Sequence, residues 1–285
     1  MPSRDLPHHA AHLPLRRSQI VSGLQHLGVR TGVVLMVHAS ISRLGWVVGG
    51  SQTVVEALLE AVGPDGTLLA YAGWEDNPYH LSEWPPGWQD AYRQEMPPFD
   101  TSLAEARHVN GRLPERIRTW PGSLRSDHPE AGFVALGARA EELITAQARD
   151  DPYGPCSPLG RLVAADGQLL LLGAPFTSLT LLHHAESLAD LPGKRRITYE
   201  MPLRRGNDVV WETFTDIATG ANGRDGGALP YEQVLGEESA ADFVRDVVTG
   251  AGLGRTGRVG AGDCYLVAAR DFVTFTTNWL TVHFG

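Results

Sequence analysis

The sequence predicts an α/β protein with a central mixed, largely parallel sheet flanked by helices, and with a C-terminal α+β portion. One observation is a succession of strand, helix and strand within residues 33–71. Another is the run of four leucines at 169–172 followed by Gly-Ala-Pro, which is typical of a buried strand that breaks into a loop. The third is composition, because 285 residues of which 42% are hydrophobic can bury a sizeable core.

The N-terminal third predicts one α/β unit. Apolar residues recur at helical spacing in 18–28, and the apolar run 33–37 is typical of a buried strand. A capping box at Thr53-x-x-Glu56 predicts a helix that ends near residue 62, and a second strand follows at 67–71. Two strands joined by a crossover helix pair in parallel, and ligands of such sheets lie beyond the carboxyl ends of the strands. Residues 38–40 and 74–76 fall there.

A long acidic and aromatic loop, residues 74–100, follows the second strand. It holds six acids against one arginine, shows little helical or alternating pattern, and is longer than most loops, so we expect a binding loop. The elements expected after it are a strand at 132–136, a helix at 138–146, a strand at 168–172, a hairpin pairing 197–201 with 209–215, a helix at 231–248, and strands at 264–267 and 272–276.

The chain is expected to form a flexible N-terminal tail over residues 1–17 and a single domain over 18–285. It has no apolar run of about 18 residues, and its first residues lack the apolar core of a signal peptide. We therefore expect a cytoplasmic protein without a membrane partner. The two cysteines, Cys156 and Cys264, are too few for a disulfide framework and are expected to be reduced.

The formal net charge of −9 argues against a nucleic-acid partner, which needs a basic face to displace counterions from phosphates. Acidity favours cationic ligands, although a charge of this size also serves solubility alone. Several common catalytic motifs are absent from the sequence: the phosphate-binding loop, the Gly-x-Ser-x-Gly elbow and the His-Glu-x-x-His zinc site. The dinucleotide-like pattern Gly252-x-Gly254-x-x-Gly257 follows a helix rather than a strand, so we interpret it as a turn.

The segment Thr180-x-x-His183-x-x-Glu186 directly follows the leucine strand and its loop. A histidine and a carboxylate three residues apart share one helix face. Such a carboxylate fixes the imidazole tautomer and stabilises the imidazolium, which suits a general base. The same pair is also common as a surface hydrogen bond, so the chemistry depends on support from other motifs.

An ordered set of motifs supplies that support. The motifs are Val-His-Ala-Ser at 37–40, Tyr-Ala-Gly-Trp-Glu at 71–75, Pro-Pro-Phe-Asp at 97–100, Arg-Ser-Asp-His-Pro at 125–129, Ser-Pro at 157–158, Leu-Leu-Leu-Gly-Ala-Pro at 170–175, the Thr180 to Glu186 segment, Thr-Tyr-Glu-Met-Pro at 198–202 and Cys-Tyr-Leu at 264–266. Together they resemble the aminoglycoside 3-N-acetyltransferase family. The resemblance covers nearly the whole chain from about Ser18, and it does not extend to the common acetyltransferase fold, whose acetyl-CoA loop is missing here.

The resemblance implies acetyl transfer from acetyl-CoA to the 3-amino group of a 2-deoxystreptamine aminoglycoside, which inactivates the antibiotic. His183 is then the general base and Glu186 its orienting partner, with no metal involved. The expected cofactor-binding residues are Val37, His38, Ala39, Ser40, Ser42 and Arg43 on one wall, and Ser123, Arg125 and Ser126 on the other. Oxyanion donors are expected from backbone N–H groups of the 173–180 loop or around residue 40.

A polycationic substrate calls for carboxylates and flat aromatic surfaces. The expected substrate-binding residues are Tyr71, Trp74, Glu75, Asp76, Asp100, Asp216 and Asp225. Some of these have plainer interpretations, because an acidic loop is often a solvated face and Asp100 is placed to cap a helix. Arg125 is equally suited to the surface, and His128, restricted by the following proline, is interpreted as structural.

Two departures from the family pattern bear on these expectations. Gly132 stands where family members commonly have serine, and residues 216–223 differ from the expected acidic stretch, which puts the antibiotic spectrum in doubt. Three alternatives stay open: acetyl transfer to another amine on the same fold, a catalytically idle aminoglycoside-binding protein, and a metal-dependent hydrolase that uses His183, Glu186 and His128. A homodimer is also compatible with the sequence.

Overall fold

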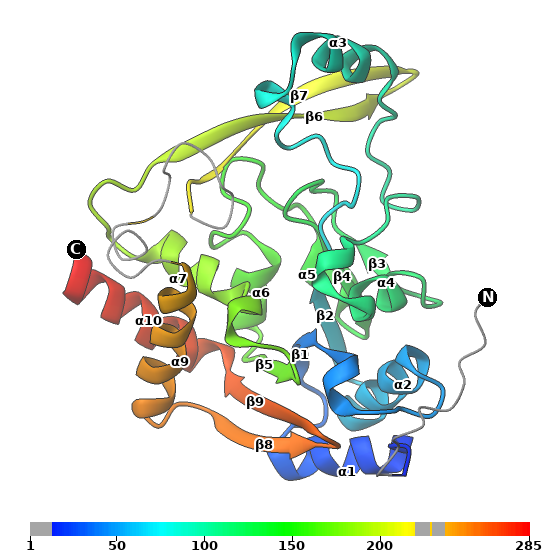
Figure 1. Cartoon of the computed structure of the whole chain (residues 1–285), viewed down its shortest axis with the longest axis vertical. Coiled ribbons are helices and arrows are strands. Elements are labelled where there is room, and N and C mark those ends of the chain that lie inside the picture. Colours follow the sequence, from blue (N-terminus) through cyan, green and yellow to red (C-terminus); the bar gives the residue numbers. More distant parts are fainter. Residues whose placement is uncertain (1–12, 220–228, 230–236) are drawn as a thin grey trace.

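The computed structural model describes residues 13–219, Leu229 and residues 237–285 of the chain. Its core is one sheet with strand order β3-β4-β2-β1-β5-β9-β8 (Figure 1). Strand β1 pairs in parallel with β2 and β5, and the outer pairings are antiparallel. The strands are β1 Val34–Ala39, β2 Thr67–Tyr71, β3 Leu124–Arg125, β4 Phe133–Gly137, β5 Gln168–Leu172, β8 Arg255–Val259 and β9 Gly262–Ala268.

Helices cover both faces of this sheet because alternate strand residues point to opposite sides. Leu35 and Val37 pack toward α1, α2 and α4, whereas Val34 and Met36 pack toward α5, α6, α7, α9 and α10. The helices are α1 Arg17–Leu27, α2 Ser51–Val62, α3 Pro86–Glu95, α4 Arg112–Arg118, α5 Ala140–Ile144, α6 Pro158–Ala164, α7 Leu181–Leu188, α9 Glu237–Gly250 and α10 Ala269–Phe284, with short 3₁₀ turns at η1 Ile41–Leu44, η2 Leu81–Glu83, η3 His108–Asn110 and η4 Phe176–Ser178.

The predicted α/β class with a mixed sheet and flanking helices is confirmed, and parallel pairing is concentrated in the three central strands. Strand β1, helix α2 and strand β2 form the predicted parallel unit. The capping box predicted at Thr53 is wrong, because α2 begins at Ser51 with Gly50 as its N-cap and makes no side-chain cap bond.

Two further predictions of secondary structure are wrong. The strand expected at 272–276 lies inside α10, where Ala269, Phe272, Val273 and Thr276 are buried at helical spacing. The loop expected over residues 74–100 contains η2 and α3, and α3 buries none of its residues, which is why no apolar period marked it. Strand β8 also follows directly where only a turn was expected around Gly254.

A separate two-stranded hairpin, β6 Arg196–Arg205 and β7 Asp208–Ile217, stands above the sheet at the top of Figure 1. This confirms the predicted hairpin, although both strands are longer than expected. Residues from the 74–104 segment pack on the hairpin in a small apolar cluster of Trp74, Tyr79, Phe99, Ala104, Tyr199, Met201, Leu203 and Phe214. The hairpin thus holds this segment over the sheet.

The ends of the predicted elements lie partly outside the described residues. Of the expected N-terminal tail, residues 1–12 are not described, and Leu15 donates its N–H to Trp46 O at 2.7 Å. Asp225 and the start of the helix expected at 231–248 also lie outside the described residues. Every helix in the described ranges is too short or too polar to span a bilayer.

Candidate active site

Two cavities meet above the carboxyl ends of the central strands. The first, here called the polar cavity, has a volume of about 250 Å³ and is lined by residues of β2, η3, α7 and β7. The second, here called the groove, has a volume of about 840 Å³ and runs between residues 38–42 and 174–180. The side chains that line both are Tyr71, Asn110, Thr180, His183 and Glu186. These five residues mark the junction between the cavities.

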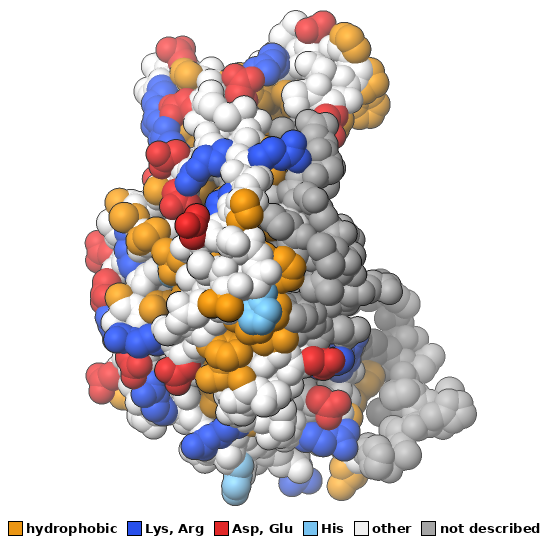
Figure 2. Space-filling view, turned by 90° about the vertical axis from the view of Figure 1, so that its left-hand side faces the viewer, with side chains coloured by type: hydrophobic (Ala, Val, Ile, Leu, Met, Phe, Trp, Pro, Cys, Tyr) orange, Lys and Arg blue, Asp and Glu red, His pale blue; other side chains and the backbone are white. Residues whose placement is uncertain are grey.

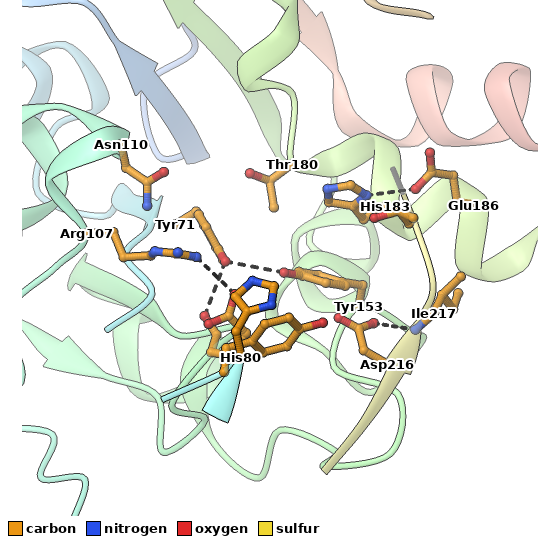
Figure 3. A pocket seen from close by; sticks show the side chains of 13 residues that line it. Tyr71, His80, Arg107, Asn110, Tyr153, Thr180, His183, Glu186, Asp216 and Ile217 are labelled. Atoms are coloured by element: carbon orange, nitrogen blue, oxygen red, sulfur yellow. Dashed lines mark hydrogen bonds and ion pairs between the residues drawn. The ribbon is translucent and has the colours of Figure 1, made fainter. Parts of the chain in front are cut away.

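His183 and Glu186 form a directly bonded pair at this junction (Figure 3). The His183 ring nitrogen Nδ1 donates to Glu186 Oε2 at 2.7 Å. The His183 side chain is 25% exposed, whereas that of Glu186 is 2% exposed. A carboxylate that accepts from Nδ1 fixes the neutral tautomer with its lone pair on Nε2. The pair therefore presents a proton acceptor to the cavities.

Local structure explains how α7 holds this pair. The helix begins after Thr180, and its three-residue spacing places His183 and Glu186 on one face. The next residue, His184, is buried and its ring nitrogen Nδ1 donates to Tyr153 O at 2.6 Å. The Tyr153 ring in turn lies 5.1 Å from the His183 ring, centroid to centroid. His183 is thus held in place from its own helix and from the segment before α6.

The polar cavity contains three carboxylates and one guanidinium. Asp216 lies at the end of β7 next to the final residue, is buried, and accepts the Ile217 N–H at 2.7 Å. Burial, as the largest cause, and to a lesser extent the nearby Glu130 raise the pKa of Asp216 to about 7. Glu130 Oε1 accepts from Arg107 Nη1 at 3.1 Å. The cavity is therefore polar, with acidic groups suited to a cation.

Two tyrosines separate the acidic groups. The Tyr71 hydroxyl donates to Glu130 O at 3.2 Å, and the Tyr153 hydroxyl donates to Tyr71 Oη at 3.4 Å. Burial raises the pKa of both phenols above the usual range, so both stay neutral hydrogen-bonding groups. They form the floor between His183 and Arg107 in Figure 3.

The groove is built largely from backbone-rich turns. At the end of β5, Gly173 has a φ of +67°, and a Cβ there would lie 3.1 Å from Ser40 O. Glycine thus lets the 173–180 segment pass close to the turn at residue 40. Phe176 anchors the segment on Tyr265, with ring centroids 4.9 Å apart. Arg112 supplies a guanidinium to the same groove.

The structure brings together only part of the predicted cofactor set. His38, Ala39, Ser40 and Ser42 line the groove, and burial lowers the pKa of His38 to about 4, which keeps it neutral. The other five predicted residues fall outside the lining of both cavities: Val37, Arg43, Ser123, Arg125 and Ser126.

Each of these five has a structural place. Val37 is in the core, and Arg43 is exposed. Arg125 Nη1 donates to Ala104 O at 2.8 Å and Nη2 donates to Gly73 O, so its charge holds the segments around the polar cavity together. Ser126 Oγ accepts the Phe133 N–H at 2.9 Å, and Ser123 Oγ lies 3.4 Å from Ala135 O. Ser123, Arg125 and Ser126 thus line neither cavity, and a second cofactor wall formed by them stays a prediction.

Only some of the residues predicted to bind substrate line the polar cavity. Tyr71 and Asp216 line the polar cavity. Trp74 is buried against Phe99, Glu75 Oε2 accepts the His108 N–H at 2.7 Å, and Asp100 Oδ1 accepts the Ser102 N–H at 2.8 Å. The polar groups of the loop are thus engaged locally, Asp76 is exposed outside the cavity lining, and Asp225 lies outside the described residues.

Sequence reasoning missed several lining residues. Glu130 follows the His128-Pro129 motif, and Tyr153, Arg107 and Asn110 lie in segments without a recognised pattern. The 74–100 loop does contribute, through Tyr79 and His80 rather than through its acids. His128 is buried, its ring nitrogen Nδ1 accepts the Ala131 N–H at 2.9 Å, and it packs on Phe214, as expected for a structural histidine.

The face of the molecule drawn in Figure 2 does not share the acidity of the polar cavity. It shows acidic and basic side chains interspersed instead of a single-sign patch. Arg93 Nη2 of α3 pairs with Glu200 Oε2 of the hairpin at 2.6 Å, and Arg205 pairs with Glu212 within the hairpin. Surface ion pairs of this kind contribute little to stability but cancel local charge.

Comparison with known proteins places this geometry in a family. A family model described as aminoglycoside 3-N-acetyltransferase matches residues 36–281. Aminoglycoside N(3)-acetyltransferase VIII from Streptomyces fradiae is 47% identical over 275 residues, covering 95% of this chain and 94% of that protein. The structure of AAC-IIIb with CoASH has a TM-score of 0.85 and 40% identity, covering 95% of this chain and 97% of that one.

A further solved structure, sisomicin-bound AAC-VIa, has a TM-score of 0.86 and 36% identity and covers 96% of this chain and 100% of that one. The match of the family model and the identity to the Streptomyces fradiae protein both extend over most of the chain, through both cavities and the His183–Glu186 pair. The chain belongs to the aminoglycoside 3-N-acetyltransferase family and is an acyltransferase.

Proposed function

We propose that this protein transfers the acetyl group of acetyl-CoA to the 3-amino group of a 2-deoxystreptamine aminoglycoside, with His183 as general base. One observation carries the proposal: the His183–Glu186 pair lies where a polar cavity with acidic groups meets a larger groove. An enzyme that joins two substrates needs its proton acceptor at the boundary between their sites. Two relatives with the same fold, one bound to CoASH and one to sisomicin, support this division of the site.

The groove suits the pantetheine chain and phosphates of acetyl-CoA. Its walls at residues 38–42 and 174–180 offer backbone polar groups and small side chains, which allow an extended amide chain to approach closely. Arg112 adds the charge-assisted donors that phosphate prefers. Leu179, Leu182 and Val244 supply the apolar surface that a methylene chain requires.

The polar cavity suits the ammonium-bearing sugar. Within the part of the chain that the structure describes, buried Asp216 accepts a hydrogen bond from the Ile217 N–H, and an ammonium group of the substrate would add charge-assisted hydrogen bonds to its carboxylate. The Tyr71 and Tyr153 rings offer flat surfaces to the sugar ring. An amine bound in the polar cavity therefore reaches His183 from the side opposite the groove.

The residues at the junction can accept the proton and stabilise the charges that the reaction produces. As the amine nitrogen attacks the thioester carbonyl, one N–H proton passes to His183 Nε2, and Glu186 stabilises the resulting imidazolium. The new C–N bond forms, the C–S bond breaks, and the CoA thiolate departs with little acid assistance because a thiol has a pKa of about 8.5. Thr180, whose hydroxyl does not cap α7, is a donor for the developing oxyanion.

Removal of the base tests this proposal. We expect His183→Ala to lower kcat by at least about 100-fold, because positioned acid–base catalysis contributes about 10²–10⁴-fold. Glu186→Gln should lower kcat by at least about tenfold through loss of the fixed tautomer. CoA-thiol release at saturating concentrations of both substrates measures kcat, and His26→Ala on the exposed face of α1 is the matched control.

Both substrates should still bind to these variants, because each changes a single lining residue and leaves Asp216 and the other residues that line the two cavities unchanged. Circular dichroism and the two KM values check that the fold and the sites are intact. A His183→Ala enzyme that retains wild-type kcat would place the general base elsewhere.

A further inference from the structure

Arg107 brings a positive charge into a cavity whose other charged residues are mainly acidic. It lines the polar cavity together with Glu130, Glu186 and Asp216. Its side chain is 36% exposed, and its Nη1 donates to Glu130 Oε1 at 3.1 Å. A guanidinium at this place needs an explanation in a site that accepts polycations.

The backbone and the stem of Arg107 fix where its guanidinium lies. The Arg107 N–H donates to Ala72 O at 2.8 Å. Gly73 has a φ of +59°, and a Cβ there would lie 2.7 Å from Arg107 Cδ, so only glycine leaves room for the stem. Figure 3 shows Arg107 and Asn110 on one side of Tyr71, and His183 and Glu186 on the other. Arg107 is therefore held at the end of the cavity remote from the base.

The Arg107 end of the polar cavity offers hydrogen-bond donors, whereas the Asp216 end offers acceptors. A guanidinium carries five N–H donors and no acceptor. Among the described residues, its partners are Glu130 Oε1 and the Tyr71 hydroxyl, which leaves donors for a ligand. A hydroxyl group has lone pairs that accept such donors, whereas an ammonium group has only donors and carries a like charge.

We propose that Arg107 determines substrate specificity by favouring aminoglycosides that present a hydroxyl group, and disfavouring those that present an ammonium group, at the Arg107 end of the polar cavity. This inference rests on the proposed function. Glu130 partly neutralises Arg107, but an ammonium group that pairs with Glu130 Oε1 must compete with the guanidinium already bonded to that oxygen. The Asp216 end remains the place for ammonium groups.

Matched substrate pairs test the inference. Neomycin and paromomycin differ by an ammonium or a hydroxyl at one sugar carbon, and kanamycin B and kanamycin A differ in the same way at another. The measured quantity is the ratio of kcat/KM for the hydroxyl member to that for the ammonium member, in wild type, Arg107→Gln and Arg107→Lys. Glutamine offers a carbonyl acceptor without charge, and lysine is the control that keeps the charge.

We expect the wild-type ratio to exceed about tenfold in at least one pair, because like charges at close range in a partly buried site cost at least that much. The ratio should fall toward unity in Arg107→Gln, where Glu130 is released to accept the ammonium, and persist in Arg107→Lys. Equal ratios in wild type and Arg107→Gln for both pairs would overturn the inference while leaving acetylation intact. A wild-type enzyme that turns over none of the four compounds would contradict the proposed function instead.

Discussion

In the proposed function, Asp216 is the residue whose ionisation we expect to couple most directly to substrate binding. Burial raises its pKa to about 7, so near neutrality it exchanges between a neutral acid and a carboxylate. Only the carboxylate attracts an ammonium group strongly. The free enzyme should therefore bind an aminoglycoside better as the pH rises through about 7.

This shift predicts a step in the pH profile. We expect kcat/KM for the aminoglycoside to rise with pH through an ionisation near 7 that is absent in Asp216→Asn, because kcat/KM reports groups of the free enzyme. The variant should also have a KM at least about tenfold higher at pH 8, given the strength of hydrogen bonds to charged groups. Steady-state kinetics between pH 5.5 and 9, a range of about four units around that ionisation, provide the measurement.

Asp100→Asn is the matched control for this experiment. Asp100 was also predicted to bind substrate, but it bonds locally to Ser102 and lines neither cavity. Its substitution should leave the profile and KM unchanged. Identical profiles for wild type and Asp216→Asn would show that another group controls binding.

At the residue scale, the sequence predicted best where function depends on local spacing. His183 and Glu186 lie three residues apart on one helix, so their contact follows from the chain itself. Glu130 and Asp216 come together in the cavity only through the fold. The local sequence does not distinguish Asp216, which lines the cavity, from Glu75, whose carboxylate bonds to His108. The type of a polar residue does not reveal whether a neighbouring group already pairs with its hydrogen-bonding atoms.

The element that shapes the groove is the turn after β5. We expect Gly173→Ala to raise the KM for acetyl-CoA about tenfold while changing the KM for the aminoglycoside far less. The added Cβ would lie 3.1 Å from Ser40 O and 3.2 Å from Leu44 Cδ2, which forces the two walls of the groove to shift. Initial-rate kinetics with each substrate varied in turn provide both KM values.

Gly193→Ala separates this effect from backbone strain. Gly193 has a φ of +74°, similar to the +67° of Gly173, but a Cβ there meets nothing within 4 Å. Both variants carry the strain of a left-handed alanine, about 1–2 kcal/mol. Only Gly173→Ala should alter the groove, and an equal rise in the acetyl-CoA KM of both variants would assign the effect to strain.

At the element scale, buried elements were predictable and exposed ones were not. The β1, α2 and β2 unit and the leucine strand carry strong apolar patterns. Helix α3 has no buried residue and therefore no apolar period. In α10, the β-branched and aromatic run at 272–276 resembles a strand locally, and its helical burial becomes evident only over the full sixteen residues of the helix.

The fold of the whole molecule places the polar cavity and the groove at one edge of its sheet. Parallel pairing of β1 with β2 and β5 gathers the ends of these strands, and the hairpin of β6 and β7 adds Asp216 from above (Figure 1). The hairpin sits there through apolar packing of the 74–104 segment. Such long-range packing has no signature in a single sequence, which explains why Trp74 was predicted to bind substrate although it packs in the apolar cluster under the hairpin.

The most direct test of the whole account is the identity of the acetylated product. Purified enzyme is incubated with acetyl-CoA and each of several 2-deoxystreptamine aminoglycosides and unrelated amines, CoA-thiol release is followed, and the product is mapped by mass spectrometry and NMR. The account predicts a single acetyl group on the 3-amino nitrogen of the aminoglycosides, dependent on His183. Turnover confined to other amines, or aminoglycoside binding without CoA release, would contradict it.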